Sequence, residues 1–168
     1  MAAEVLILFV VPALLAAAAG WDLASYTIPN FVPLALVAAF VVFVLAAGMT
    51  PGAVGAHALA GLIGLAVGFA LFALGYIGGG DAKLFAAVVL WLGFADLLDY
   101  ALVTSLFGGG LALALMSLRR LPLPAPLSAQ GWLQRLHDSR SGVPYGVALA
   151  AAALVLLPHT EVFRFATA

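Results

Sequence analysis

Six apolar stretches separated by short polar breaks constrain what this chain can fold into. They cover residues 5–20, 31–48, 57–76, 84–95, 101–118 and 145–158. A helix that crosses a membrane needs about 20 mostly apolar residues. With 66% hydrophobic and only 8% charged residues, a soluble fold of this size would have too few charges to cover its surface. We therefore predict an all-α polytopic membrane protein with six transmembrane helices, forming a single membrane-embedded domain over residues 1–168.

The distribution of lysine and arginine predicts the orientation. The loops after the first, third and fifth helices lie on one side and hold five of the six basic residues, whereas the other side holds Arg164. Because loops rich in Lys and Arg stay in the cytoplasm, we place these loops there and both termini on the external or periplasmic side. The first stretch carries Glu4 in place of a basic region, so we interpret it as a span and not as a signal peptide.

The longest loop, residues 119–143, is predicted to be cytoplasmic. Its first half is rich in proline, which excludes a regular helix. Its second half places Trp132, Leu133 and Leu136 among polar and basic residues, a pattern typical of a short amphipathic helix on the inner membrane surface. An ordinary solvated linker is the alternative interpretation.

Two carboxylates stand out because of where they lie. Asp22 ends the first span, and Asp81 precedes the fourth, so the predicted topology puts both on the cytoplasmic side. Ionisable groups at membrane depth are costly and face the protein interior or a water-filled cavity, so the two side chains can converge. Two close carboxylates share a proton. One then takes a proton from water while the other gives one to a carbonyl oxygen, as in aspartic proteases.

The neighbouring residues allow a functional and a structural interpretation. Gly78 and Gly80 permit unusual backbone conformations and a close approach of a substrate backbone. Pro29 is predicted at the first position of the second helix. In the structural alternative, Asp81 only caps the fourth helix and Asp22 is a solvated charge at a helix end.

Two segments together resemble a known family. "DLASYTIPN" at 22–30 and "GGGDAKL" at 78–84 are similar to the two signatures of type IV prepilin peptidases, the G-x-G-D aspartic membrane peptidases. "WLG" at 91–93 and "VPYGVA" at 143–148 also resemble family patterns. The resemblance implies that Asp22 and Asp81 are the catalytic pair.

The resemblance also implies a reaction and a location. Such enzymes remove the basic leader of a pilin precursor at the cytoplasmic face of the bacterial or archaeal cytoplasmic membrane. The chain has no cysteine and lacks the zinc-binding insertion of the larger members, so it resembles the minimal Tad/Flp-type or preflagellin peptidases, and N-methylation is not implied. We expect no metal and no cofactor. The expected partners are the lipid bilayer and a prepilin with a basic leader and an apolar helix; the net charge of −1 gives no indication of nucleic acid.

Other residues near the signatures have open roles. Lys83 matches the family pattern; it either keeps Asp81 ionised, anchors the loop at lipid headgroups or follows the cytoplasmic bias of positive charge. Asn30 either starts the second helix or forms a hydrogen bond near the site. Tyr145 either reaches the site or belongs to an interfacial aromatic belt. The glycines at 108–110 are expected to loosen or kink the fifth helix.

Two other functions are compatible with intramembrane carboxylates. A small ion- or proton-coupled transporter also uses them, although its acids are expected to face one another deeper within the helices. A non-catalytic component of a pilus or secretion assembly is the other alternative.

Overall fold

The computed structural model describes residues 1–124, 126 and 129–167, and within these ranges the chain is helical, with no strand. This confirms the predicted all-α class. The helices are α1 (Ala2–Val5), a π-helical segment η1 (Leu6–Val10), α2 (Val11–Ser25), α3 (Phe31–Ala47), α4 (Pro51–Ala73), α5 (Gly79–Leu92), α6 (Leu97–Leu118), α7 (Gly131–His137), α8 (Tyr145–Leu156), the 3-10 segment η2 (Leu157–His159) and α9 (Glu161–Thr167).

Three helices are long and apolar enough to cross a membrane. They are Ala2–Ser25, in which α1, η1 and α2 are continuous, Pro51–Ala73 and Leu97–Leu118. α3 and α8 are shorter apolar helices. α5 has 14 residues, which at about 1.5 Å per residue gives roughly 21 Å, less than the roughly 30 Å of a bilayer core. Three spans are thus supported by length, while six spans and the sides of the termini stay predictions.

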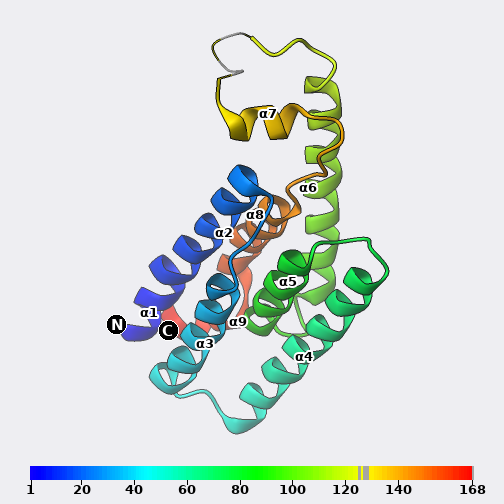
Figure 1. Cartoon of the computed structure of the whole chain (residues 1–168). Helices are drawn as coiled ribbons and strands as arrows, with labels where there is room; N and C mark the ends of the chain where they lie inside the picture. Colours follow the sequence, from blue (N-terminus) through cyan, green and yellow to red (C-terminus); the bar gives the residue numbers. More distant parts are fainter. Residues whose placement is uncertain (125, 127–128, 168) are drawn as a thin grey trace.

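The helices run up and down between two ends of the bundle (Figure 1). The N- and C-termini lie at one end, and α7 lies beyond the other. α4 packs along α5, while both α2 and α6 pack against α8. The end of α2 and the starts of α5 and α8 all point towards α7. This arrangement brings segments distant in sequence together at one end.

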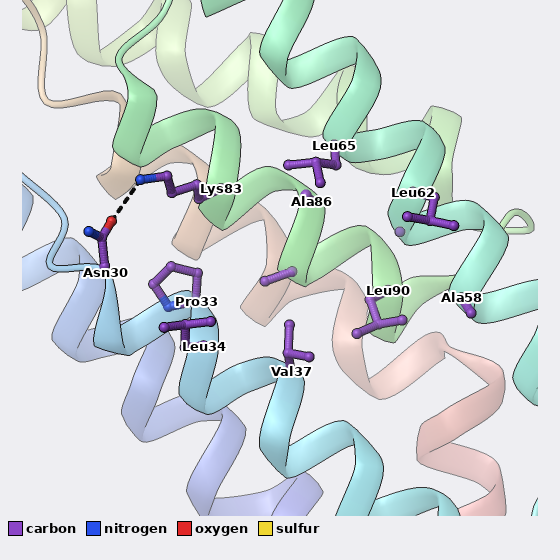
Figure 2. A pocket seen from close by; sticks show the side chains of 12 residues that line it. Asn30, Pro33, Leu34, Val37, Ala58, Leu62, Leu65, Lys83, Ala86 and Leu90 are labelled. Atoms are coloured by element: carbon purple, nitrogen blue, oxygen red, sulfur yellow. Dashed lines mark hydrogen bonds between the residues drawn. The ribbon is translucent and has the colours of Figure 1, made fainter.

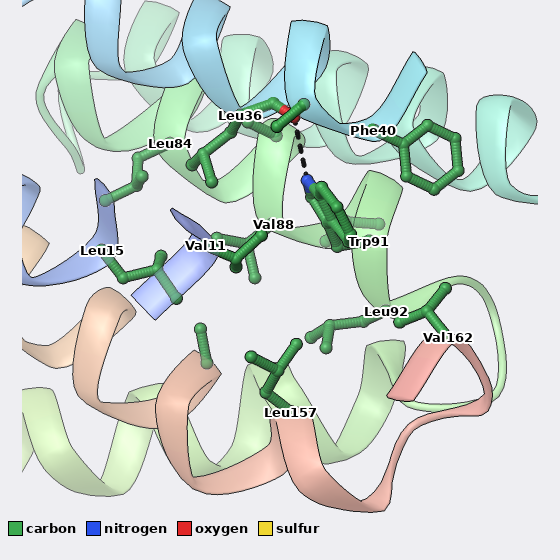
Figure 3. Close-up of a cluster of buried hydrophobic side chains, with 14 of the residues drawn as sticks. Val11, Leu15, Leu36, Phe40, Leu84, Val88, Trp91, Leu92, Leu157 and Val162 are labelled. Atoms are coloured by element: carbon green, nitrogen blue, oxygen red, sulfur yellow. Dashed lines mark hydrogen bonds between the residues drawn. The ribbon is translucent and has the colours of Figure 1, made fainter. Parts of the chain in front are cut away.

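Trp91 anchors α5 in the core (Figure 3). Its side chain is 1% exposed, and its indole N–H donates to the carbonyl of Leu36 on α3 at 2.9 Å. Its ring contacts Phe40 and Phe43, each at a centroid distance of 5.3 Å. Because a buried indole N–H needs an acceptor, this bond fixes how α5 lies against α3.

Two glycines four residues apart, Gly64 and Gly68, let α4 lie close to α5. A Cβ added at Gly64 would lie 3.1 Å from the Val89 Cβ, and one added at Gly68 would lie 3.0 Å from the carbonyl oxygen of Ala82. Both distances are tighter than ordinary van der Waals contact. Small residues at a helix contact permit this close approach, and the start of α5, which carries Asp81, is thereby held against α4.

The prediction that Pro29 occupies the first position of a helix is wrong. α3 begins at Phe31 with Asn30 as its N-cap residue, and Pro29 lies in the connecting segment before it. The carbonyl of Pro29 accepts the N–H of Val32 at 3.0 Å, so a turn precedes the helix. Pro33 is the proline that lies in the first turn of α3.

α4, α5 and α6 begin earlier than their apolar stretches, α4 at Pro51. α5 begins at Gly79, so Asp81 lies within its first turn. α6 begins at Leu97, with Asp99 in its first turn. A carboxylate there interacts favourably with the positive end of the helix dipole, so both polar starts extend the helices beyond their apolar stretches.

Within the loop 119–143, α7 forms and is tied to the bundle. The Arg135 guanidinium donates to the carbonyl of Ala24 at the end of α2, at 2.9 Å. Arg119 donates to the carbonyls of Leu136 and Gly142, both at 2.9 Å. Residues 125 and 127–128 of the proline-rich half lie outside the described residues, as does residue 168. The position of α7 at a membrane surface stays a prediction.

Candidate active site

Asp22 is buried in the last turn of α2. Its exposed fraction is 5%, and its Oδ2 atom accepts the N–H of Gly146, at the start of α8, at 2.7 Å. The helix ends just beyond it, where Tyr26 takes a left-handed conformation with φ of 56° and donates its N–H to the carbonyl of Asp22. Asp22 is therefore not a solvated charge at a helix end, which excludes that alternative.

Asp81 is the third residue of α5 and is half-buried. Its Oδ2 atom accepts the N–H of Gly78 at 3.2 Å, so the capping role considered for it is present. A Cβ added at Gly78 would lie 3.0 Å from that oxygen, so glycine suits this position. Because a carboxylate has two oxygens and about four lone-pair sites, the cap leaves capacity for a reacting group.

The structure brings the two acids to the same end of the bundle. Asp22 lies in the last turn of α2 and Asp81 in the first turn of α5, at the helix ends that point towards α7. Ile28 connects their surroundings, because a Cβ added at Gly80 would lie 3.1 Å from the Ile28 Cβ and one added at Gly146 would lie 2.7 Å from its Cδ1. Three distant segments thus meet around one isoleucine, and their close packing requires glycine on both sides of it.

A cavity of about 220 Å³ opens beside Asp81. It lies between the α4–α5 pair and the α6–α8 pair, and its walls include Phe85, Thr104, Tyr145 and Leu149. Tyr145 therefore reaches the site, which was one of the two roles considered for it from the sequence. The cavity gives a carboxylate an apolar, partly enclosed space next to it.

Lys83 lies on a different face of α5 from Asp81. Residues two apart on a helix of 3.6 residues per turn point to nearly opposite sides. The Lys83 ammonium donates to the Asn30 side-chain oxygen at 2.8 Å (Figure 2), and Asn30 makes no side-chain cap of α3. This bond ties the two signature segments together, and both residues line a groove of about 640 Å³ with otherwise apolar walls from α3, α4 and α5.

That larger groove does not include either aspartate. Its walls are alkyl side chains, such as Leu34 and Leu62, apart from the Lys83–Asn30 pair. Its lining holds no carboxylate, and its one ionisable side chain, Lys83, is bonded to Asn30, so the candidate site is the smaller cavity at Asp81. Within the described ranges, no group of three or more His, Cys, Asp or Glu side chains is arranged to hold a metal ion.

Several residues of the site were not predicted from the sequence. Gly146 and Ile28 contact the acids or their loops, and Gly108 faces Tyr145 across α6 and α8. "VPYGVA" contained a hint, because Gly146 is the second residue of the helix that begins at Tyr145, and the first N–H groups of a helix have no partner within it. Which partner the Gly146 N–H meets depends on helix packing, which the sequence pattern does not specify.

The fold and the site define a helical membrane protein with a pair of carboxylates at one end of its bundle. The sequence pattern of the type IV leader peptidase family matches residues 9–113, more than half of the chain and a range that includes Asp22 and Asp81. The chain belongs to this family and has a leader-peptidase type of function. Neither the comparison with curated proteins nor that with solved structures gave a match.

Proposed function

We propose that the chain is an aspartic endopeptidase that removes the leader of a type IV-like prepilin of the Flp/Tad kind at the cytoplasmic face of the membrane. One observation carries the proposal: Asp22 and Asp81 lie at the same end of the bundle, each accepting a glycine N–H. Such contacts hold both carboxylates in place before substrate binds. Membership of the type IV leader peptidase family supports the substrate: the bond that is cut joins a leader peptide to the rest of a protein.

The reaction needs only the two carboxylates and water. The ionised carboxylate takes a proton from water, and the water oxygen attacks the carbonyl carbon of the scissile bond. The protonated carboxyl gives its proton to the carbonyl oxygen, forming a tetrahedral diol. As the diol collapses and the C–N bond breaks, one diol hydroxyl gives its proton to the carboxylate that is now ionised, and the other carboxyl gives its proton to the departing nitrogen. Either aspartate fits either role at the start of the cycle.

The geometry favours a peptidase over a transporter. Ion and proton pathways place their carboxylates near the bilayer midplane. Here Asp22 is in the last turn of its helix and Asp81 is in the first turn of its own, so both lie at helix ends, where the leader of a membrane-anchored substrate would arrive. A non-catalytic assembly component would leave the leader in place, which the experiment below distinguishes.

The test is leader removal in cells. The chain is co-expressed with a small pilin-like protein, carrying a basic leader before an apolar stretch, in a host without prepilin peptidases. We expect the mass of the pilin to fall by that of the leader, and Asp22→Asn and Asp81→Asn to abolish the change at normal membrane levels of the enzyme. Cleavage that survives either substitution would remove that aspartate from the mechanism. No cleavage by the unmodified chain would contradict the proposal.

A further inference from the structure

The cavity beside Asp81 has the size of one side chain. Its volume is about 220 Å³, whereas pockets for small-molecule ligands run from about 300 to 1,000 Å³. A cavity of about 150 Å³ lined by apolar side chains is enough to hold benzene. The space therefore accommodates a single leucine, methionine or phenylalanine side chain and is too small for a separate cofactor or a helix.

The chemistry of the cavity walls suits an apolar group. Phe85, Leu149 and Leu71 present carbon surfaces, and the hydroxyl groups come from Thr104 and Tyr145. The one ionisable acid in its lining is Asp81. A side chain seated in this space leaves its own backbone beside that carboxylate, where a scissile peptide bond would have to lie.

The cavity is reached from the apolar surface of the bundle. Leu71 and Val67 of α4 line it and are 37% and 46% exposed. It lies between α4, which packs along α5, and α6, which packs along α8. A substrate embedded in the bilayer therefore has a lateral path to Asp81 that does not cross the polar end of the bundle.

Tyr145 forms a wall of the cavity, and its ring lies directly against α6. Its ring crosses α6 at Gly108, where an added Cβ would lie 2.3 Å from the ring, so any larger residue would displace it. Cβ atoms added at Gly109 and Gly110 would meet nothing within 4 Å. The next residue, Gly146, holds Asp22 through its N–H. One dipeptide thus places a cavity wall and one of the two acids.

We propose that this cavity is the subsite for an apolar substrate side chain next to the scissile bond, and that Tyr145 is its specificity-determining residue. The inference rests on the proposed peptidase function and adds which feature of the substrate the site selects. It predicts that the rate of cleavage depends on the size of that substrate side chain. It also predicts that substitutions around the cavity change this size dependence while both aspartates stay in place.

The test compares three pilin substrates that carry alanine, leucine or phenylalanine at each residue flanking the scissile bond. Ala101→Phe adds a ring at the cavity wall, and Leu102→Phe is the matched control, because Leu102 is the next residue of α6 and is 63% exposed. We expect one of the two flanking substrate positions to respond to Ala101→Phe. For substrates with leucine or phenylalanine at that position, the variant should lower kcat/KM at least tenfold more than for the alanine substrate, mainly by raising KM. Leu102→Phe should leave all three values unchanged.

A second pair of variants tests the wall itself. Gly108→Ala displaces the Tyr145 ring and should change the ratio of kcat/KM between phenylalanine and alanine substrates at least threefold, whereas Gly109→Ala should not. Tyr145→Ala enlarges the cavity and should shift that ratio towards phenylalanine. Ser105→Leu, at an exposed position of the cavity lining, replaces Ala101→Phe if the latter fails to accumulate in membranes.

The outcomes separate the two proposals. If the unmodified chain cuts the substrates but the cavity variants lower kcat/KM equally for all three side chains, the peptidase stands and the subsite is refuted. If Tyr145→Ala and Gly108→Ala leave the ratios unchanged, Tyr145 does not determine specificity. If the unmodified chain cuts none of the substrates, the proposed function itself fails.

Discussion

Replacing Gly146 with alanine should disturb the catalytic pair without touching either carboxylate. The added Cβ would lie 2.9 Å from the Asp22 Oδ2 and 2.7 Å from the Ile28 Cδ1, whereas ordinary contact begins at 3.4 Å. Ile28 is itself buried, with an exposed fraction of 7%, so it has little room to retreat. The carboxylate therefore has to move by about half an ångström, and its 2.7 Å bond from the Gly146 N–H lengthens.

The size of the effect follows from that bond. A hydrogen bond to a charged group contributes about 1.5–3 kcal/mol, and about 1.4 kcal/mol corresponds to a factor of ten in rate. We therefore expect Gly146→Ala to lower kcat/KM for leader removal by about 10- to 100-fold. The loss should appear mainly in kcat, because the displaced group acts on the reacting atoms and not on distant parts of the substrate.

The assay measures leader removal from a purified pilin substrate by the purified enzyme in detergent micelles. Gly142→Ala is the matched control, because a Cβ added there would meet nothing within 4 Å, and it should keep full activity. Thermal unfolding of both variants separates a local shift from a loss of fold. Full activity of Gly146→Ala, with an unfolding midpoint equal to that of the control, would refute the role given to this contact.

Three further predictions concern the pair and the scaffold. Because one carboxylate must be ionised and the other protonated, kcat/KM should fall at low pH, where both are protonated, and at high pH, where both are ionised; a rate that is flat from pH 4 to 9 would contradict the pair. Trp91→Phe leaves the Leu36 carbonyl without its indole donor and should cost about 1–3 kcal/mol of stability, measured by thermal unfolding, whereas Trp21→Phe, at a 43% exposed position, should cost less. Arg135→Ala removes the bond to Ala24 and should speed proteolysis within residues 119–143 while membrane levels stay normal; an unchanged digestion rate would argue against this attachment.

The location of both acids at the same end of the bundle was predictable from the sequence. Apolar stretches that alternate in direction put the end of the first helix and the start of the fourth segment on the same side, so Asp22 and Asp81 had to share one end of the bundle. The glycines before Asp81 also indicated a tight backbone there. These inferences depend only on the order of the apolar stretches and on local residue types.

The contacts that complete the site were not predictable in this way. Gly146 meets Asp22, and Gly108 meets Tyr145, because of the rotation and depth at which α8 packs against α2 and α6. A pattern of apolar residues fixes neither quantity when nearly every residue is apolar. Pro29 was placed wrongly for a related reason: a proline near a helix start fits the turn before the helix as well as its first position, and the hydrogen bond that decides between them joins backbone atoms.

The short length of α5 has a consequence for the lipid around the proposed enzyme. At roughly 21 Å, this helix is shorter than the roughly 30 Å hydrocarbon core of a bilayer. If α5 is one of the predicted spans, local thinning of the bilayer accommodates it. Asp81 lies in the first turn of α5, where such a dimple would bring the aqueous phase down to the carboxylates. The hydrophobic mismatch of one helix would then bring to the carboxylates the water that hydrolysis consumes.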